Sequence, residues 1–294
     1  MYSILVHTKS FIKFFILDGG IKLDSKRKIE NSLKLFDNFS VEYIDMAKYN
    51  LKKFPDTTQY SVNTFSRYFI SELSLGFDKV LYLDSDTIVN SDISELYDED
   101  LEMYPIGVVL EDFYKKNAKY IKDYLYSKFS SDIKSFNAGV MLIAVPKFRE
   151  GNYIDLLLEK TFELADKLSC PDQDIFNIIF DNNYKILDYK YNFMPDLKKF
   201  YYREKKFKEI YDKNYDNAVV YHYVSGKPWY LQSVKSVIFW KYLLKTDFKY
   251  FCIFNIPKYY YNKYYSKILK FVKYFCPPIY EILTINKKLN KDLR

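Results

Sequence analysis

Glycine and proline are scarce in this chain, at seven and nine of 294 residues. Collagen-like repeats and low-complexity linkers are therefore excluded. The three cysteines, Cys170, Cys252 and Cys276, form no C-x-x-C pair and no zinc-like cluster with histidine, and their odd number argues against a disulfide framework. A reducing compartment fits this cysteine usage best.

No apolar run reaches the roughly 18 residues that a membrane-spanning helix needs. The first residues also differ from a signal peptide, because they lack a basic start and Lys13 interrupts their apolar run before Asp18. We therefore expect a protein that is made and kept inside the cell.

Apolar and aromatic residues are plentiful, at 49% and 20%, so the chain is able to bury an enzyme-sized core. The charge is uneven. Residues 235–294 carry twelve lysines and one arginine against three acidic residues, a balance of +10, which leaves −3 for the first 234 residues. A basic, aromatic tail of this kind is typical of segments that seek phosphate groups.

Short apolar runs alternate with helically periodic ones along the body of the chain. The pattern predicts strands at 11–17, 41–45, 79–84, 105–110, 136–143 and 219–222, and helices at 25–36, 64–75, 113–129, 154–168 and 175–180. The run at 79–84 is typical of a strand buried on both faces. Alternating strands and helices predict an α/β fold with a mixed, mostly parallel sheet.

In the tail, a helical wheel places Lys263, Lys267, Lys270 and Lys273 on one face. The opposite face carries Ile268, Leu269, Phe271, Val272 and Phe275. The pattern predicts a basic amphipathic helix that stops at Pro277 and Pro278.

The sharpest local signal is Asp84-Ser85-Asp86, which lies at the C-terminal end of the predicted strand 79–84. Two carboxylates separated by one residue are able to turn toward one divalent cation, and hard oxygen ligands favour Mn²⁺ or Mg²⁺. Spacing alone leaves open a plain turn that caps the next segment, because such short motifs also occur by chance.

Six motifs taken in order make the pattern more specific, and together they resemble glycosyltransferase family 8 over about residues 3–235. They are Thr64-Phe-Ser-Arg67, Lys79-Val-Leu-Tyr-Leu-Asp-Ser-Asp86, Phe136-Asn-Ala-Gly-Val-Met-Leu142, Asp172-Gln-Asp174, Tyr191-Asn-Phe-Met-Pro195 and His222-Tyr-Val-Ser-Gly-Lys-Pro-Trp229. The resemblance implies a GT-A type, Rossmann-like fold and transfer of glucose or galactose from a UDP-sugar with retained anomeric configuration.

The resemblance also implies roles for single residues. Asp84, Asp86 and His222 would hold Mn²⁺ (or Mg²⁺), while Lys227 and the backbone of Gly226 would lie near the diphosphate. A metal and a lysine stabilise charge on a departing UDP without a protonated acid. The remaining donor-binding residues implied are Ser85, Arg67, Asn137 and Asp172, with Gln173 beside the anomeric carbon and Gln173 and Asp172 as the catalytic pair.

Each of these residues also has a structural interpretation. By residue type alone, Arg67 is as readily an exposed charge on a helix surface as a donor-binding residue. Asn137 suits a turn at a strand entry, Asp172 suits a helix N-cap, and a lone histidine such as His222 is more often structural than a metal ligand. His7 is assigned no role.

Family members that build lipopolysaccharide lie on the inner face of the bacterial cytoplasmic membrane through basic, aromatic C-termini. The resemblance therefore implies a catalytic domain at 1–245, a membrane-associating tail at 246–294, and a lipid-linked saccharide acceptor in lipopolysaccharide or lipooligosaccharide core. Lysine and aromatic side chains suit anionic headgroups. A tail helix packed on the body is the alternative, and no motif indicates nucleic-acid binding.

Two departures from the family pattern stand out. The chain starts inside what would be the first helix, so we expect the first strand and its uracil-binding loop to be missing. The spacing between His222 and Lys227 is one residue shorter than in related galactosyltransferases. A truncated, inactive remnant is thus one alternative. An aspartate-nucleophile phosphatase is another, weakened by Ile88, where that motif has Thr or Val.

Overall fold

The computed structural model describes residues 1–55, 61–74, 76–112, 134–164, 170–230 and 233–251. Its strands are β1 (Ile12–Asp18), β2 (Phe39–Asp45), β3 (Lys79–Leu83), β4 (Thr87–Val89), β5 (Ile106–Leu110), β6 (Phe136–Ala144), β7 (Lys185–Ile186) and β8 (Val220–His222). Its α-helices are α1 (Tyr2–His7), α2 (Leu23–Leu33), α3 (Ile70–Leu73), α4 (Ser94–Asp98), α6 (Val145–Glu150), α7 (Tyr153–Leu164), α8 (Pro171–Phe180), α9 (Lys198–Tyr201), α10 (Lys205–Asn214) and α11 (Ser236–Leu243).

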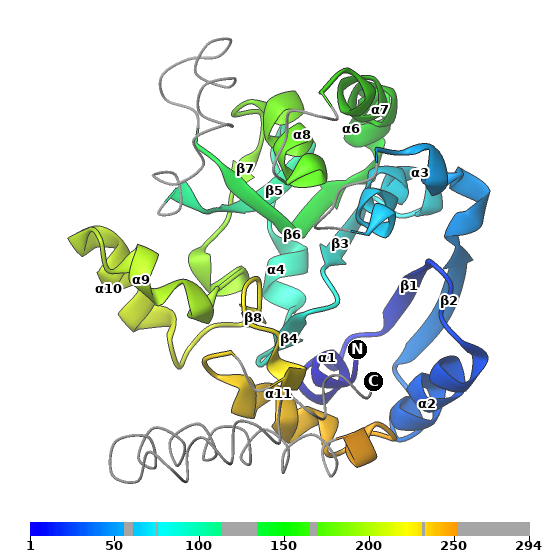
Figure 1. Ribbon diagram of the computed structural model, residues 1–294, viewed down its shortest axis with the longest axis vertical. Coiled ribbons are helices and arrows are strands. Elements are labelled where there is room, and N and C mark those ends of the chain that lie inside the picture. The colour runs from blue at the N-terminus through cyan, green and yellow to red at the C-terminus, as the bar shows by residue number, and fades with distance from the viewer. Residues whose placement is uncertain (56–60, 75, 113–133, 165–169, 231–232, 252–294) are drawn as a thin grey trace, which may run out of the picture.

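The described strands form three sheets (Figure 1). The largest has the order β3-β6-β5-β7, in which β6 is antiparallel to both β3 and β5, whereas β5 and β7 are parallel. Parallel β1 and β2 form a second sheet, and antiparallel β4 and β8 form a third. The predicted mixed α/β architecture is confirmed. The expected majority of parallel pairs is wrong for the described strands, because β6 runs against both of its neighbours.

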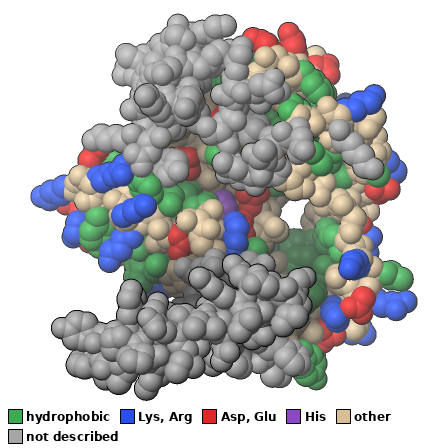
Figure 2. All heavy atoms as spheres, in the orientation of Figure 1, with side chains coloured by type: hydrophobic (Ala, Val, Ile, Leu, Met, Phe, Trp, Pro, Cys, Tyr) green, Lys and Arg blue, Asp and Glu red, His purple; other side chains and the backbone are tan. Residues whose placement is uncertain are grey.

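Strand β3 is only partly buried, unlike β5 and β6, every residue of which is buried. Both faces of β3 border apolar clusters, but the full burial predicted for the strand at 79–84 is wrong. The reason lies in the topology, since β3 pairs with β6 alone and no described strand covers its other edge. Figure 2 shows an opening through the molecule at this place, between β3 and β1.

Two apolar clusters cover opposite faces of the large sheet. Val80 and Tyr82 of β3 pack on the cluster that helices α7 and α8 complete, whereas Leu81 and Leu83 pack on the other. Phe14 of β1 reaches that second cluster too, so β1 and β3 border the same core although they share no hydrogen-bond ladder. Burial of such clusters is the main stabilising contribution to the fold.

The side-chain amide of Asn177 joins helix α8 to the start of β6 by two hydrogen bonds. The Asn177 Nδ2 donates to the carbonyl of Phe136 at 3.0 Å, and the Phe136 N–H donates back to Asn177 Oδ1 at 2.8 Å. Residues one turn earlier on α8 consequently face the first residues of β6. In Figure 1 this helix lies over the sheet, next to α6 and α7.

The segment predicted as a helix at 64–75 is one continuous helical stretch of two kinds. Residues Val62–Phe69 form a 3₁₀ helix capped by the Ser61 hydroxyl, and the α-helix proper is limited to Ile70–Leu73. The tighter helix turns Arg67 inward, where its Nη1 donates to the Ala138 carbonyl at 2.9 Å. A 3₁₀ run of eight residues is unusual, since most are no longer than about four.

The other predicted elements within the described residues are found, with ends that shift by a few positions. Residues 113–129, the end of the helix predicted at 154–168 and the tail beyond residue 251 lie outside the described residues. Among the residues that are described, no helix combines the length and the apolar character that crossing a bilayer requires.

Candidate active site

Two strand pairings bring the aspartates and the histidine together. Asp84 directly follows β3, and its N–H donates to the Gly139 carbonyl of β6 at 2.8 Å. The chain then turns through Asp86 into β4, where Thr87 lies opposite His222 of β8. The Tyr223 N–H closes the turn by donating to the Asp86 carbonyl at 3.0 Å. Residues separated by more than 130 positions in sequence thus meet at one point.

The Nε2 atom of His222 lies 3.2 Å from Asp86 Oδ1 and 3.7 Å from Asp84 Oδ2. One ligand atom from each of the three residues lies within 4.8 Å of the others. His222 is 2% exposed, so it is not a surface histidine. Figure 2 shows a hollow at the centre of this face where histidine, acidic and basic side chains meet. Two carboxylates and one imidazole at this separation suit a single divalent cation.

Gly139 makes room for this group. A β-bulge shifts the register between β5 and β6, since Val108 lies opposite Met141 whereas Val109 lies opposite Asn137. A Cβ on Gly139 would be 2.2 Å from Cε1 of His222 and 2.7 Å from Oδ2 of Asp84. The backbone of β6 therefore approaches the site so closely that only glycine fits, a recurring use of bulges beside active sites.

Arg67 holds the two acids on its side of the site. Its Nη2 lies 2.8 Å from Asp84 Oδ1 and its Nε lies 3.2 Å from Asp172 Oδ2. Burial lowers the pKa of Arg67, but Asp84, Tyr82 and Asp172 together raise it well above its usual value. The Tyr82 hydroxyl donates to Asp84 at 2.7 Å, and the Thr64 hydroxyl donates to Asp172 at 2.7 Å. Buried charges are retained in this way, paired and hydrogen-bonded.

Asp86 is shared between the histidine and a lysine. The Lys227 ammonium donates to Asp86 Oδ2 and, at 3.1 Å, to the Tyr223 carbonyl. Burial raises the pKa of Asp86, but hydrogen bonds and charge from His222 and Lys227 bring this pKa well below its ordinary value. Asp86 is therefore ionised at neutral pH and available to a cation. The neighbouring Gly226 N–H is engaged by the Asp196 carboxylate.

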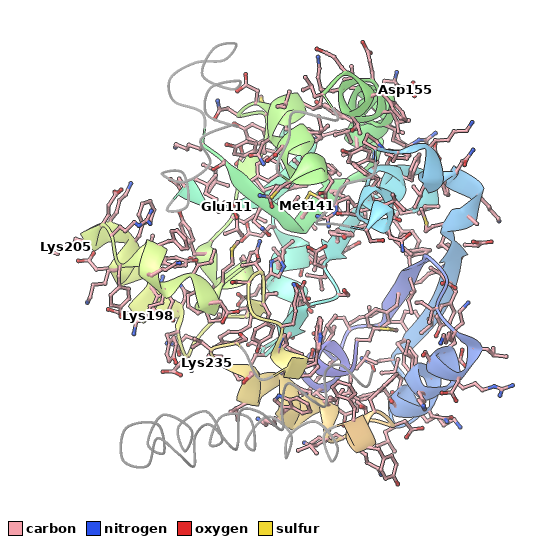
Figure 3. All side chains as sticks on the ribbon, in the orientation of Figure 1. Glu111, Met141, Asp155, Lys198, Lys205 and Lys235 are labelled. Carbon is pink, nitrogen blue, oxygen red and sulfur yellow. The ribbon has the colours of Figure 1, made fainter. Side chains whose placement is uncertain are left out.

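An amide and an acid complete the site on the α8 side. Gln173 Oε1 accepts hydrogen bonds from Asn137 Nδ2 at 2.9 Å and from the Ala138 N–H at 3.2 Å. Its Nε2 donates to Glu111 Oε1 at 2.9 Å. Burial raises the pKa of Glu111 to about 7, although the amides of Asn137 and Gln173 and the charge of His222 lower it in part. Figure 3 labels Glu111 in the interior, near Met141 of β6.

The structure decides several of the alternatives that the sequence leaves open. Arg67 is 8% exposed and ion-paired, so it is not a surface charge. The N-cap of α8 is Cys170, and Asp172 lies inside the first turn, so the N-cap interpretation of Asp172 is wrong. Asn137 is 8% exposed and bonded to Gln173, and Ser85 alone of the predicted set is an exposed turn residue.

Sequence reasoning assigned no role to Tyr82, Glu111 and Asn192. Tyr82 lies inside an apolar strand run and Glu111 directly follows another, so neither stands out in the sequence. Asn192 lies within the fifth motif, so the sequence marked its position but indicated no function for it. It is fully buried, and its Oδ1 lies 2.9 Å from Nδ1 of His222. His7, to which no role was given, contacts the Tyr242 hydroxyl at 2.6 Å.

The amino-acid sequence of this chain is similar to those of known proteins. Residues 1–233 match the sequence model of glycosyl transferase family 8. A putative glycosyltransferase of Haemophilus influenzae is 28% identical over 66% of this chain and 58% of its own length. Glycosyltransferase GlyF of Streptococcus pneumoniae is 28% identical over 82% of this chain and 56% of its own length. The chain thus spans somewhat more than half the length of these curated relatives.

Among solved structures, the galactosyltransferase LgtC, in complex with donor and acceptor sugar analogs, superposes with a TM-score of 0.70. The match covers 83% of this chain and 89% of LgtC at 24% sequence identity. At that identity the likeness shows the fold, and the GT-A fold expected from the sequence is confirmed.

Proposed function

Because this chain belongs to glycosyl transferase family 8, we propose that it moves a hexose, glucose or galactose, from a UDP-sugar to a saccharide acceptor with retention of anomeric configuration. The observation that carries the proposal is the convergence of Asp84, Asp86 and His222 beside a lysine. A cation bound by these three residues, together with the lysine, would offset the negative charge that the leaving diphosphate gains as its bond to the sugar breaks.

The residues fit Mn²⁺, or Mg²⁺, as cofactor. Asp84 and Asp86 offer oxygen ligands, His222 offers Nε2, and Gly139 leaves the space between them free of a side chain. A bound divalent ion supplies Lewis-acid neutralisation of charge on the diphosphate. Arg67 and Tyr82 hold Asp84 in place for this purpose, with hydrogen bonds of 2.8 and 2.7 Å.

Lys227 is the second source of positive charge. Its ammonium donates to Asp86, so a diphosphate bound to a metal ion at Asp84 and Asp86 would lie within reach of this lysine. Asn137 and Asp172 are the partners for sugar hydroxyls, and Ser85 and Gly226 lie on the two turns that border the diphosphate position. Asp172 already accepts from Thr64 and Arg67, which fixes the direction of its free lone pairs.

Gln173 is the group that we place at the anomeric carbon. Its amide is held on both ends, by Asn137 and by Glu111, so it presents a fixed dipole and not a mobile side chain. Preorganised dipoles stabilise developing charge without reorganisation during the reaction. For the acceptor we propose a lipid-linked saccharide of lipopolysaccharide or lipooligosaccharide core, reached by a chain lying on the inner membrane face.

The proposal is tested with a panel of UDP-sugars and Mn²⁺, measuring UDP release with and without saccharide acceptors. We expect Mn²⁺-dependent release with UDP-glucose or UDP-galactose, and a loss of at least about a hundredfold in the Asp86→Ala variant, since a charged metal ligand is removed. Asp212→Ala, which removes an exposed acid paired with Lys208, is the matched control. Undiminished turnover in Asp86→Ala would rule out the metal assignment.

A further inference from the structure

A continuous chain of side-chain hydrogen bonds runs from the metal-binding group to the interior acid. His222 Nδ1 lies 2.9 Å from Asn192 Oδ1, and Asn192 Nδ2 donates to Asn137 Oδ1 at 3.0 Å. Asn137 Nδ2 donates to Gln173 Oε1, and Gln173 Nε2 donates to Glu111 Oε1, each at 2.9 Å. The chain thus joins β8 to α8 and β5 through five side chains.

All links of this chain point the same way. Each amide accepts on the side of His222 and donates on the side of Glu111, and two backbone donors fix that direction. The Gly139 N–H donates to Asn137 Oδ1 at 3.0 Å, and the Ala138 N–H donates to Gln173 Oε1 at 3.2 Å. Backbone N–H groups are donors only, so neither amide is able to reverse without losing a bond.

The two ends of the chain impose chemistry on the groups between them. At one end, Asn192 Oδ1 is an acceptor, so Nδ1 of His222 carries a proton, and Nε2 is the ring nitrogen that faces Asp84 and Asp86. At the other end, the carboxyl oxygen of Glu111 takes the Gln173 amide N–H. Burial makes both bonds costly to lose, because Asn192 is fully buried and Glu111 is 8% exposed.

We propose that Asn192 and Glu111 are positioning residues of the site. Asn192 holds His222 in the tautomer that presents Nε2 to a metal ion. Glu111 holds the amide of Gln173 in one orientation. The hydrogen bonds between them connect the metal-binding group to the sugar-binding side, so the positions of the two are coupled. This inference deepens the proposed function and rests on it for the role of Gln173, but the tautomer of His222 is measurable without any substrate.

The first experiment addresses Asn192 in the full-length chain. We expect Asn192→Leu, which removes the acceptor, to weaken Mn²⁺ binding by about 10- to 100-fold, as loss of a histidine's partner typically does. Asn192→Asp keeps an acceptor for Nδ1–H, although it gives up the donor to Asn137 Oδ1, and should retain more of the Mn²⁺ affinity than Asn192→Leu. Calorimetry with Mn²⁺ alone measures both. Equal affinity in all three proteins, or equal loss in both variants, would overturn the assignment.

A spectroscopic readout separates positioning from a general loss of structure. The chain contains only two histidines, so ¹⁵N-labelled imidazole spectra resolve His222 from His7. We expect Nδ1 of His222 to carry a proton in the wild type and in Asn192→Asp, and to lose this fixed proton in Asn192→Leu, with the signals of His7 unchanged. An Nε2–H tautomer in the wild type would contradict the proposal.

The second experiment addresses Glu111. Glu111→Gln keeps an acceptor oxygen for Gln173, whereas Glu111→Leu removes it. We expect the side-chain amide protons of Gln173, assigned with Gln173→Ala, to exchange at least about tenfold faster in Glu111→Leu than in Glu111→Gln. Asp112→Asn, which alters the neighbouring acid bonded to Tyr189, is the control and should leave them unchanged. Equal exchange in all variants would overturn this part.

Turnover then links the second part to the proposed function. If UDP-sugar is the donor, Glu111→Leu and Gln173→Ala should lower kcat by similar factors with little change in KM, and the double variant should be no worse than either. Independent, multiplying losses would contradict a positioning role. If no UDP-sugar is turned over by the wild type, the proposed function fails, while metal affinity, tautomer and amide exchange still decide the inference.

Discussion

At the scale of single residues, the backbone of Gly139 lies directly against the metal-binding group. A β-carbon there would overlap Cε1 of His222 at 2.2 Å, and His222 is too buried to move away freely. Overpacking of this kind typically costs about 1 to 3 kcal/mol. Because the added carbon would collide with His222 and Asp84, the strain would displace the metal-binding side chains and affect function as well as stability.

We therefore expect Gly139→Ala to weaken Mn²⁺ binding by at least about tenfold, because His222 or Asp84 has to leave its position. Gly107→Ala is a matched control, since its added carbon would meet Leu101 at 2.6 Å in the core, away from the site. That control should lower the thermal midpoint but keep Mn²⁺ affinity. Similar metal affinities in both variants would show that Gly139 does not shape the site.

Glu111 gives the stability of the protein a specific pH dependence. Burial raises its pKa to about 7, above the ordinary 4.5, so the folded state retains a proton that the unfolded chain releases. Between about pH 4.5 and 7, the free energy of unfolding therefore falls as pH rises, by up to about 3 kcal/mol from this group.

Replacement of Glu111 by Gln removes that titration and keeps the shape of the side chain. Relative to wild type, Glu111→Gln should gain stability as pH rises from 4.5 to 7 and show no further gain above it. Urea denaturation of the two proteins at pH 4.5, 6 and 7.5 measures the difference, in which all other titrating groups cancel. Parallel stability curves would mean that Glu111 titrates normally.

Residue types and spacing predicted the members of the site better than their partners. Asp84 and Asp86 were predicted because an acid pair after an apolar strand has a recognisable pattern, and His222 because the motif before Lys227 does. Glu111 was not predicted, because its partner Gln173 comes from a distant helix. Tyr82 was not predicted, because its place inside an apolar strand run gives no sign of its hydrogen bond to Asp84. A hydrogen bond such as Gln173 to Glu111 depends on how α8 packs on β6, which local sequence does not specify.

At the scale of secondary structure, β3 is the element with the most unusual environment. The hydrogen bonds from Asp84 N–H to Gly139 and from Val145 N–H to Asp78 fix the phase of its ladder with β6. In an antiparallel pair, alternate residues direct their backbone groups to opposite sides. Val80 and Tyr82 therefore bond toward β6, while the N–H groups of Leu81 and Leu83 face the edge without a described strand.

This geometry predicts an alternating pattern of hydrogen exchange along β3. The amides of Leu81 and Leu83 should exchange more than about a hundredfold faster than those of Val80 and Tyr82, because within the described part of the chain only the latter have a backbone partner. Strand β6 is the internal control, since Met141 bonds toward β3 and Leu142 toward β5. NMR exchange rates measure both strands. Uniform protection along β3 would show that another segment covers this edge in solution.

Hydrophobic periodicity predicted where the helices and strands lie, but not the direction of every strand or the type of every helix. Strand β6 was predicted from its apolar run, yet its antiparallel direction was not, because a buried run reads alike in either direction. The 3₁₀ form of Val62–Phe69 was missed for a similar reason. Its spacing satisfies a helix, while the inward pull on Arg67 by Asp84 and Asp172 is tertiary.

At the scale of the whole molecule, the positive charge is concentrated outside the described body. Residues 252–294 carry eight lysines and one arginine against two acidic residues, a balance of +7 that equals the net charge of the entire chain. Residues 1–251 are therefore neutral overall. If the tail binds an anionic bilayer, as we propose, the attraction belongs almost entirely to residues 252–294 and should weaken with salt.

A truncation after Phe251 tests this proposal and keeps two contacts that hold the last described segment. Phe251 stacks on Trp240 with ring centroids 6.1 Å apart, and the Asp247 N–H donates to Ser32 at 2.9 Å. We expect the full chain to co-sediment with phosphatidylglycerol vesicles at low salt and the 1–251 form to stay in the supernatant. A full-length variant with the eight tail lysines replaced by glutamine keeps the aromatic residues and separates charge from apolar insertion. Loss of binding in that variant assigns the anchor to charge, whereas vesicle binding by the 1–251 form would place the membrane contact on the body and refute the tail anchor.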